Sequence, residues 1–157
     1  MASALCACLC LAGPPAGAQD SGPEFVAQAA SPQSGYYGAC GADVPIGVTI
    51  RAGLNSPFSL AVTLSYRYVS VASAIPPSPI LHARMPLFAA GTYAAAVIIS
   101  DQAPAYLKGS DGSLQYRIEA KDPSGNLAQG GPGSVGIRYC ASPNSVAARS
   151  AAARADR

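Results

Sequence analysis

The chain has 157 residues, of which 50% are apolar and only 11% are charged. This composition is typical of a globular protein and excludes a disordered or fibrous one. The formal net charge is +2, and no stripe of Lys and Arg alternates with exposed aromatic residues. We therefore expect no nucleic acid among the partners of this protein.

The first eighteen residues resemble an export signal. The apolar run 4–12 has the length of a signal-peptide core, and Ala16-Gly17-Ala18 matches a small-x-small cleavage site before Gln19. No Lys or Arg precedes the run, which leaves open an atypical signal or a start further upstream. A lipoprotein signal is the alternative, because residues 5–8 loosely resemble a lipobox. We expect residues 1–18 to be a signal peptide and the mature protein to be secreted or periplasmic.

Three of the five cysteines lie inside that signal, so the mature chain would retain Cys40 and Cys140. In an oxidising compartment the default for such a pair is a structural disulfide. Closing a loop of about 100 residues contributes about 4.7 kcal/mol at best in the chain-entropy model. We expect a disulfide between Cys40 and Cys140, and no transmembrane segment in the mature chain, because it lacks a run of eighteen apolar residues.

Apolar and polar residues alternate along the segment 40–140, and turn residues interrupt the alternation at short intervals. This pattern predicts half-buried antiparallel strands and no helix. The expected strands are 44–51, 60–71, 80–87, 92–100, 114–121 and 135–140. An even number of strands returns the chain to the end of the fold at which it started, so Cys40 and Cys140 could meet there. A slip in the alternation at Val69 predicts a bulge or a change of sheet.

The remaining segments are expected to be irregular. Residues 19–39 are predicted to be a flexible lead-in, or to contain one edge strand near Tyr36 and Tyr37. Residues 101–111 are predicted to form a long loop, and residues 141–157 a mobile tail rich in Ala and Arg.

Four motifs carry a resemblance to a known family. They are LSYRY at 64–68, RMP at 84–86, GTYAAAV at 91–97 and LQYRIEAKDPSGN at 114–126. Together they resemble bacterial Ig-like or fibronectin type III-like domains, over residues 44–140. The resemblance implies an all-β fold, an antiparallel immunoglobulin-like β-sandwich of six to seven strands over residues 40–140. It also implies a spacer, adhesion module or docking surface, and it transfers no catalytic residue.

Enzyme and metal motifs are missing from the mature sequence. His82 is the single histidine, and neither G-x-S-x-G nor H-E-x-x-H occurs. We therefore expect no enzyme, no cofactor and no metal site. The oxygen-bearing loop residues could hold Ca²⁺, but turn formation explains them without a metal and is the preferred interpretation; they are Asp101, Asp111, Asp122 and Asn126.

Three tyrosines outside the clean alternation are candidate ligand contacts: Tyr36, Tyr37 and Tyr106. Arg67 and Glu119 are expected to form an exposed cross-strand pair that serves stability. The leading hypothesis is a secreted, non-enzymatic interaction or structural module whose partner is an unknown extracellular or envelope protein or glycan. The alternatives are a carbohydrate-binding protein that uses the tyrosines, and a hydrolase that uses His82.

Overall fold

The computed structural model describes residues 22–39, 45–53 and 59–142. Three predictions fall outside these residues. They concern the expected signal peptide 1–18, Cys40 of the expected disulfide, and the tail beyond residue 142.

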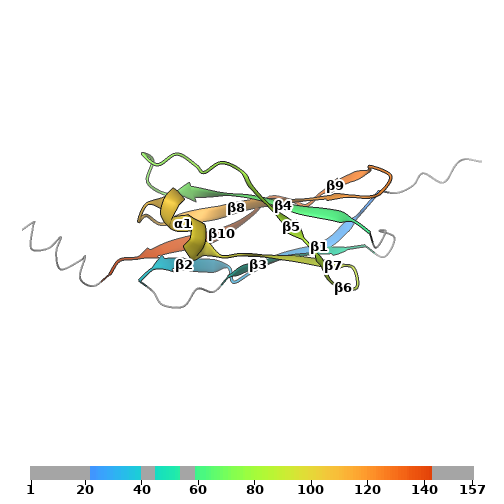
Figure 1. Ribbon diagram of the computed structural model, residues 1–157, viewed down its shortest axis with the longest axis horizontal. Coiled ribbons are helices and arrows are strands. Elements are labelled where there is room, and N and C mark those ends of the chain that lie inside the picture. The colour runs from blue at the N-terminus through green and yellow to red at the C-terminus, as the bar shows by residue number, and fades with distance from the viewer. Residues whose placement is uncertain (1–21, 40–44, 54–58, 143–157) are drawn as a thin grey trace, which may run out of the picture.

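Two β-sheets pack face to face in an elongated sandwich (Figure 1). The smaller sheet is antiparallel and has the strand order β1-β3-β7-β6. Its strands are β1 (Phe25–Ser31), β3 (Ile46–Ala52), β6 (Leu87–Ala89) and β7 (Thr92–Val97). The predicted fold is therefore confirmed as a mostly-β, two-sheet structure.

The larger sheet is mixed and curls into a half-barrel. Its main order is β2-β10-β8-β4-β5, and β9 pairs with β8 beside this path. The prediction of purely antiparallel strands is wrong at one place, because β2 runs parallel to β10. The strands are β2 (Ser34–Gly38), β4 (Ala61–Ser70), β5 (Leu81–Met85), β8 (Gly112–Lys121), β9 (Leu127–Gln129) and β10 (Gly133–Cys140). The described residues thus form ten strands instead of the six to seven expected.

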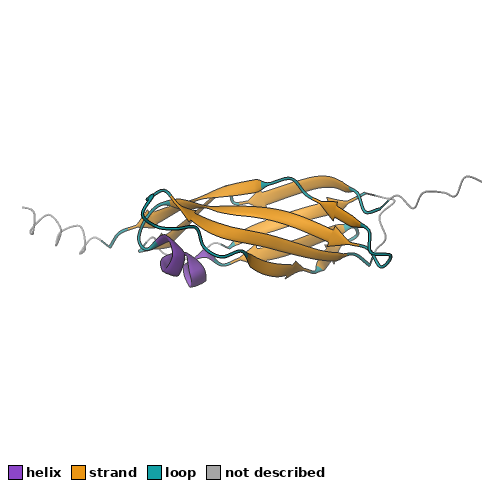
Figure 2. Ribbon diagram, turned by 90° about the horizontal axis from the view of Figure 1, so that it is seen from above, coloured by secondary structure: helices purple, strands orange, loops and turns teal. Residues whose placement is uncertain are grey.

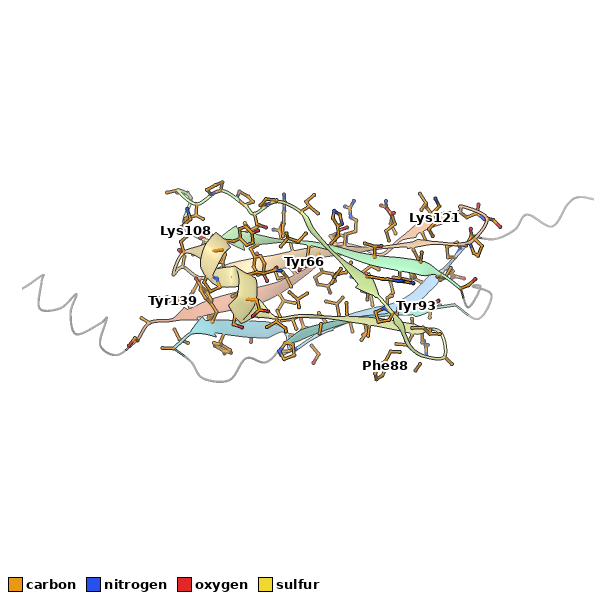
Figure 3. All side chains as sticks on the ribbon, in the orientation of Figure 1. Tyr66, Phe88, Tyr93, Lys108, Lys121 and Tyr139 are labelled. Atoms are coloured by element: carbon orange, nitrogen blue, oxygen red, sulfur yellow. The ribbon has the colours of Figure 1, made fainter. Side chains whose placement is uncertain are left out.

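The alternation of apolar and polar residues produces half-buried strands, as predicted. Every second residue of the long strands faces the other sheet, and these residues are buried: Ile46, Val48, Ile50, Val62, Leu64, Tyr66, Tyr68, Leu114, Tyr116, Ile118, Ala120, Val135 and Ile137. Tyr66 and Tyr93 reach into the space between the two sheets, whereas Phe88 points away from it (Figure 3). Since successive side chains in a strand point to opposite faces, the residues between the buried ones form the outer face of each sheet.

The chain changes sheet at Pro86, and not at Val69 as predicted. The register of β4 against β8 runs without a bulge from Ala61↔Lys121 to Ser70↔Gly112. Strand β5 belongs to the larger sheet and β6 to the smaller one, with Pro86 between them. Proline has no N–H to donate to a ladder, so it suits the point where the chain leaves one sheet for the other.

A helix, α1 (Ile99–Leu107), replaces much of the predicted loop 101–111, and it lies at one end of the sandwich (Figure 2). Its buried residues recur every fourth position, at Ile99, Ala103 and Leu107. The helix ends where Lys108 adopts a left-handed conformation. The loop was predicted because the segment ends in the turn residues Gly109-Ser110-Asp111-Gly112.

The predicted lead-in contributes two strands. Strand β2 contains Tyr36 and Tyr37 and lies at one edge of the larger sheet. Strand β1 was not predicted, because its sequence FVAQAAS lacks strict alternation and buries only Ala30. It forms by pairing its backbone with β3.

Candidate functional site

The outer face of β4 and β8 carries a regular array of polar side chains. The register places Ser65 opposite both His82 of β5 and Arg117 of β8. One step along the strands, Arg67 lies opposite Gln115, and Gln115 lies opposite Ser134 of β10. These residues come from four strands that are distant in sequence, and the sheet aligns them in adjacent rows.

A solvent-open groove of about 660 Å³ lies over this array. The six polar residues that define it are Ser65, Arg67, His82, Gln115, Arg117 and Glu119. Ile80 lines it on the β5 side, and Gln129, Pro132 and Ser134 line it on the side of β9 and β10. We call this surface the polar groove.

Hydrogen bonds hold several groove side chains, but not that of Arg117. Arg67 donates from Nε and Nη2 to Oε1 of Gln115, at 3.1 and 3.0 Å. Ser65 Oγ and His82 Nδ1 lie 3.0 Å apart. Arg117 makes no hydrogen bond or ion pair with any other described residue. Its guanidinium is therefore available to a ligand.

The predicted pair of Arg67 and Glu119 is wrong, although their strands are neighbours. Arg67 bonds to Gln115, and Glu119 lies opposite Thr63, four positions further along β8. Gln129 Nε2 donates to Oε2 of Glu119 at 3.5 Å. The pair was predicted from the adjacency of the two strands alone. Adjacency does not determine the register, and the register places Arg67 opposite Gln115.

The three candidate tyrosines do not form one exposed surface. Tyr36 is 51% exposed on β2, whereas Tyr37 is 3% exposed and donates its hydroxyl to the carbonyl of Ser110. Burial raises the pKa of Tyr37, and backbone hydrogen bonds partly offset this effect. Tyr106 is partly buried and stacks on Tyr68, with ring centroids 5.7 Å apart. Only Tyr36 presents a free ring face, and it lies outside the polar groove.

The cysteine pair stays a prediction, because Cys40 lies outside the described residues. The chain nevertheless comes close to Cys140 just before that position. Gly38 lies opposite Cys140 in the parallel pairing of β2 and β10, and Ala39 N donates to the Cys140 carbonyl at 2.8 Å. This proximity arises from β2, and not from the count of strands that the sequence suggested.

Of the four oxygen-bearing residues predicted to lie in loops, Asp101 instead lies in the first turn of α1, and the other three lie in turns or at strand ends. Asp122 accepts hydrogen bonds from the backbone N and the side-chain amide of Asn126, both at 2.8 Å. Desolvation raises the pKa of Asp122, but the hydrogen bonds from Asn126, Ser124 and Gly125 together outweigh it and hold the pKa below its usual value. Asp111 accepts from Tyr139 N at 2.8 Å. Within the described ranges, no group of three or more His, Cys, Asp or Glu residues could hold a metal ion.

The polar groove was not predicted as a site. Arg67 and Glu119 were predicted to be exposed, but the sequence does not give the strand register that gathers the groove residues. The available signal was the unbroken polar series Gln115, Arg117, Glu119 at every second position of the predicted strand 114–121.

No protein-family model matches this chain, and no curated protein resembles it in sequence. Among the residues that the structure describes, no helix is long and apolar enough to cross a membrane. The function must therefore be argued from the geometry of the chain itself.

Proposed function

We propose that this protein is a secreted, non-enzymatic binding module with an immunoglobulin-like sandwich, and that the polar groove is its contact surface. The observation that carries the proposal is Arg117. It lies in a solvent-open groove on the outer face of the larger sheet, and no described residue neutralises its charge or occupies its hydrogen-bond donors. Because the guanidinium has five donors in a rigid fork, an unengaged arginine of this kind suits recognition of an external acceptor.

The strand order supports the immunoglobulin-like assignment. In immunoglobulin domains one sheet holds strands A, B, E and D, and the other holds C, F and G with additions beside C. The order β1-β3-β7-β6 corresponds to A-B-E-D, and β10-β8-β4-β5 corresponds to G-F-C followed by one added strand. The proposed Cys40–Cys140 bond would differ from the disulfide of antibody domains, which joins strands B and F.

Export and the disulfide can be tested together by intact mass of protein from its native host, with and without reduction and alkylation. We expect a mass that begins at Gln19, and two thiols that react only after reduction. An unprocessed chain with free thiols would contradict both the compartment and the disulfide.

The binding role is tested by capture from the native medium or envelope with three immobilised proteins: the wild type, the double variant Arg67→Ser/Arg117→Ser, and Arg138→Ser. Arg138 is an exposed arginine of the same sheet that does not line the groove. We expect a saturable ligand, protein or glycan, that the double variant loses and Arg138→Ser retains. A ligand retained equally by all three proteins would place the contact surface elsewhere, and no saturable ligand would contradict the binding role.

A hydrolase is the second candidate, favoured by the contact of Ser65 Oγ with His82 Nδ1. A serine next to a histidine is the beginning of a nucleophile-base pair. A third group that orients the imidazole is also needed, and no described residue bonds to the other ring nitrogen of His82. Ester hydrolysis that disappears in both Ser65→Ala and His82→Ala would replace the binding proposal, whereas an inert wild-type protein would remove the hydrolase from consideration.

A further inference from the structure

The polar groove has a local excess of positive charge. Arg67 and Arg117 both line it, and its only carboxylate among the described residues is Glu119. Glu119 follows Arg117 along β8, on the side away from Arg67. The part of the groove between the two arginines is therefore electropositive. Such a cluster stands out in a chain in which only 11% of the residues are charged.

The register brings the two arginines together as diagonal neighbours. Arg67 lies opposite Gln115, and Arg117 is the next residue on the same face of β8. Diagonal neighbours on a sheet face lie about 7–8 Å apart, within reach of long side chains. The two positive charges repel each other slightly. An anionic ligand held between them would be attracted by both guanidinium groups and would offset this repulsion.

The neutral lining suits a sugar chain. Hydroxyl and amide groups from Ser65, Gln115 and Ser134 can each donate and accept hydrogen bonds, as ring hydroxyls require. Ile80 is 60% exposed, and it stands with Pro132 at the sides of the groove. These two residues offer apolar surface to the C–H faces of a pyranose ring.

A peptide fits the groove less well than a glycan. The backbone groups of β4 and β8 are already paired, β4 with β5 and β8, and β8 with β4, β9 and β10. An extended peptide lying over these strands would find no ladder for its own N–H and C=O groups, which strand addition supplies only at a sheet edge. A glycan carries no such backbone requirement.

We propose that the polar groove binds an acidic polysaccharide, whose carboxylates are held by Arg67 and Arg117 while Ser65 and Gln115 contact its ring hydroxyls. This inference rests on the proposed binding function and names its ligand class. Binding is expected to weaken as salt is added, because the contacts are exposed and charged.

Affinity electrophoresis and calorimetric titration of the purified protein test the proposal with three probes: polygalacturonate as acidic glycan, dextran as neutral glycan, and polyglutamate as acidic peptide. We expect polygalacturonate to bind, dextran not to bind, and polyglutamate to bind at least tenfold more weakly than polygalacturonate. Arg67→Gln and Arg117→Gln should each weaken polygalacturonate binding about tenfold or more, the usual effect of losing a charge-assisted hydrogen bond. Arg138→Gln, the matched control, should change the affinity less than twofold.

Other outcomes separate the ligand class from the binding function. Equal weakening by Arg138→Gln would show diffuse attraction and overturn the groove site. Polyglutamate binding as tight as polygalacturonate would overturn the glycan in favour of an acidic peptide. If polygalacturonate does not bind while the double serine variant still loses its natural ligand, the acidic glycan is wrong and the binding function stands. If that variant loses nothing either, both proposals fail.

Discussion

The inner and outer faces of β4 and β8 are built from the same two stretches of chain, yet they are under different constraints. Leu64 and Ile118, which lie opposite each other on the inner face, are both 0% exposed. Ser65 and Arg117, the next opposed pair, lie on the outer face and line the polar groove. A close-packed core fixes the size and shape of each inner side chain. The outer side chains are free of that constraint, so stability and binding should respond to different substitutions.

The largest loss of stability is expected from a substitution on the inner face. Leu64→Ala should lower the free energy of unfolding by about 3–5 kcal/mol, because it removes fully buried methyl groups and leaves a cavity. The neighbouring outer-face change Ser65→Ala is the control, and it should stay within about 0.5 kcal/mol of the wild type. Urea denaturation measures both. Similar losses in the two variants would break the distinction between the faces.

The next largest loss of stability is expected when a side chain is added at a tightly packed glycine of the larger sheet. A Cβ added at Gly112 would lie 2.5 Å from the Val69 carbonyl oxygen and 2.7 Å from Leu107 Cδ2. Gly112→Ala should therefore cost about 1–3 kcal/mol, because the backbone of β4 cannot move away freely. Gly136→Ala is the control, since a Cβ there meets nothing within 4 Å. Thermal unfolding should separate the two variants, and equal midpoints would contradict this account of the packing.

A smaller effect is expected at Tyr68, whose buried hydroxyl has no hydrogen-bond partner among the described residues. Burial, and then the nearby Tyr66, Asp101 and Tyr106, raise the pKa of Tyr68 far above its ordinary value. The folded state thus holds this proton more tightly than the unfolded state. Its contribution to stability is complete below the ordinary tyrosine pKa of about 10 and is lost as the pH rises above it.

Tyr68→Phe should remove that alkaline loss and raise the free energy of unfolding at neutral pH by up to about 1 kcal/mol, because no unsatisfied hydroxyl remains buried. Denaturation curves at neutral pH and above pH 10 test both expectations. A phenylalanine variant that is clearly less stable at neutral pH would mean that the hydroxyl has a favourable interaction in the folded protein.

The smallest effect is expected at the exposed turn after β8. The hydrogen bonds that lower the pKa of Asp122 give a contribution that is present above the ordinary pKa of an aspartate and is lost as the pH falls through the lowered value. Asp122→Ala should reduce the acid sensitivity of this turn and speed amide exchange at Asn126. Unchanged exchange would show that the Asp122 side chain does not hold the turn.

The two faces also differ in how far the sequence predicts them. Strict alternation in 114–121 was enough to place every inward residue of β8, because pleating is a local property of a strand. The groove depends on contacts such as Arg67 with Gln115, which are 48 residues apart. No local pattern contains that register, so the sequence does not show which polar residues of different strands are neighbours.

The helix and the first strand were missed for other reasons. In α1 the buried residues Ile99, Ala103 and Leu107 recur at helical spacing, but no helix was predicted there, because the turn residues that follow favoured a loop. In β1 the strand is stabilised by pairing with β3 and by little burial of its own. In both segments, contacts with the rest of the fold determine the secondary structure, and the local sequence does not predict it.

The measurement that tests the central claim most directly is the equilibrium unfolding of Arg67→Gln/Arg117→Gln against the wild type in urea. If the two arginines of the outer face do not stabilise the fold, the double variant should unfold at the same denaturant concentration as the wild type or at a slightly higher one. A small increase would arise because two neighbouring like charges have been removed. A loss of more than about 1 kcal/mol would show that the arginines hold the sheet together, and it would contradict the account of the polar groove as a surface reserved for binding.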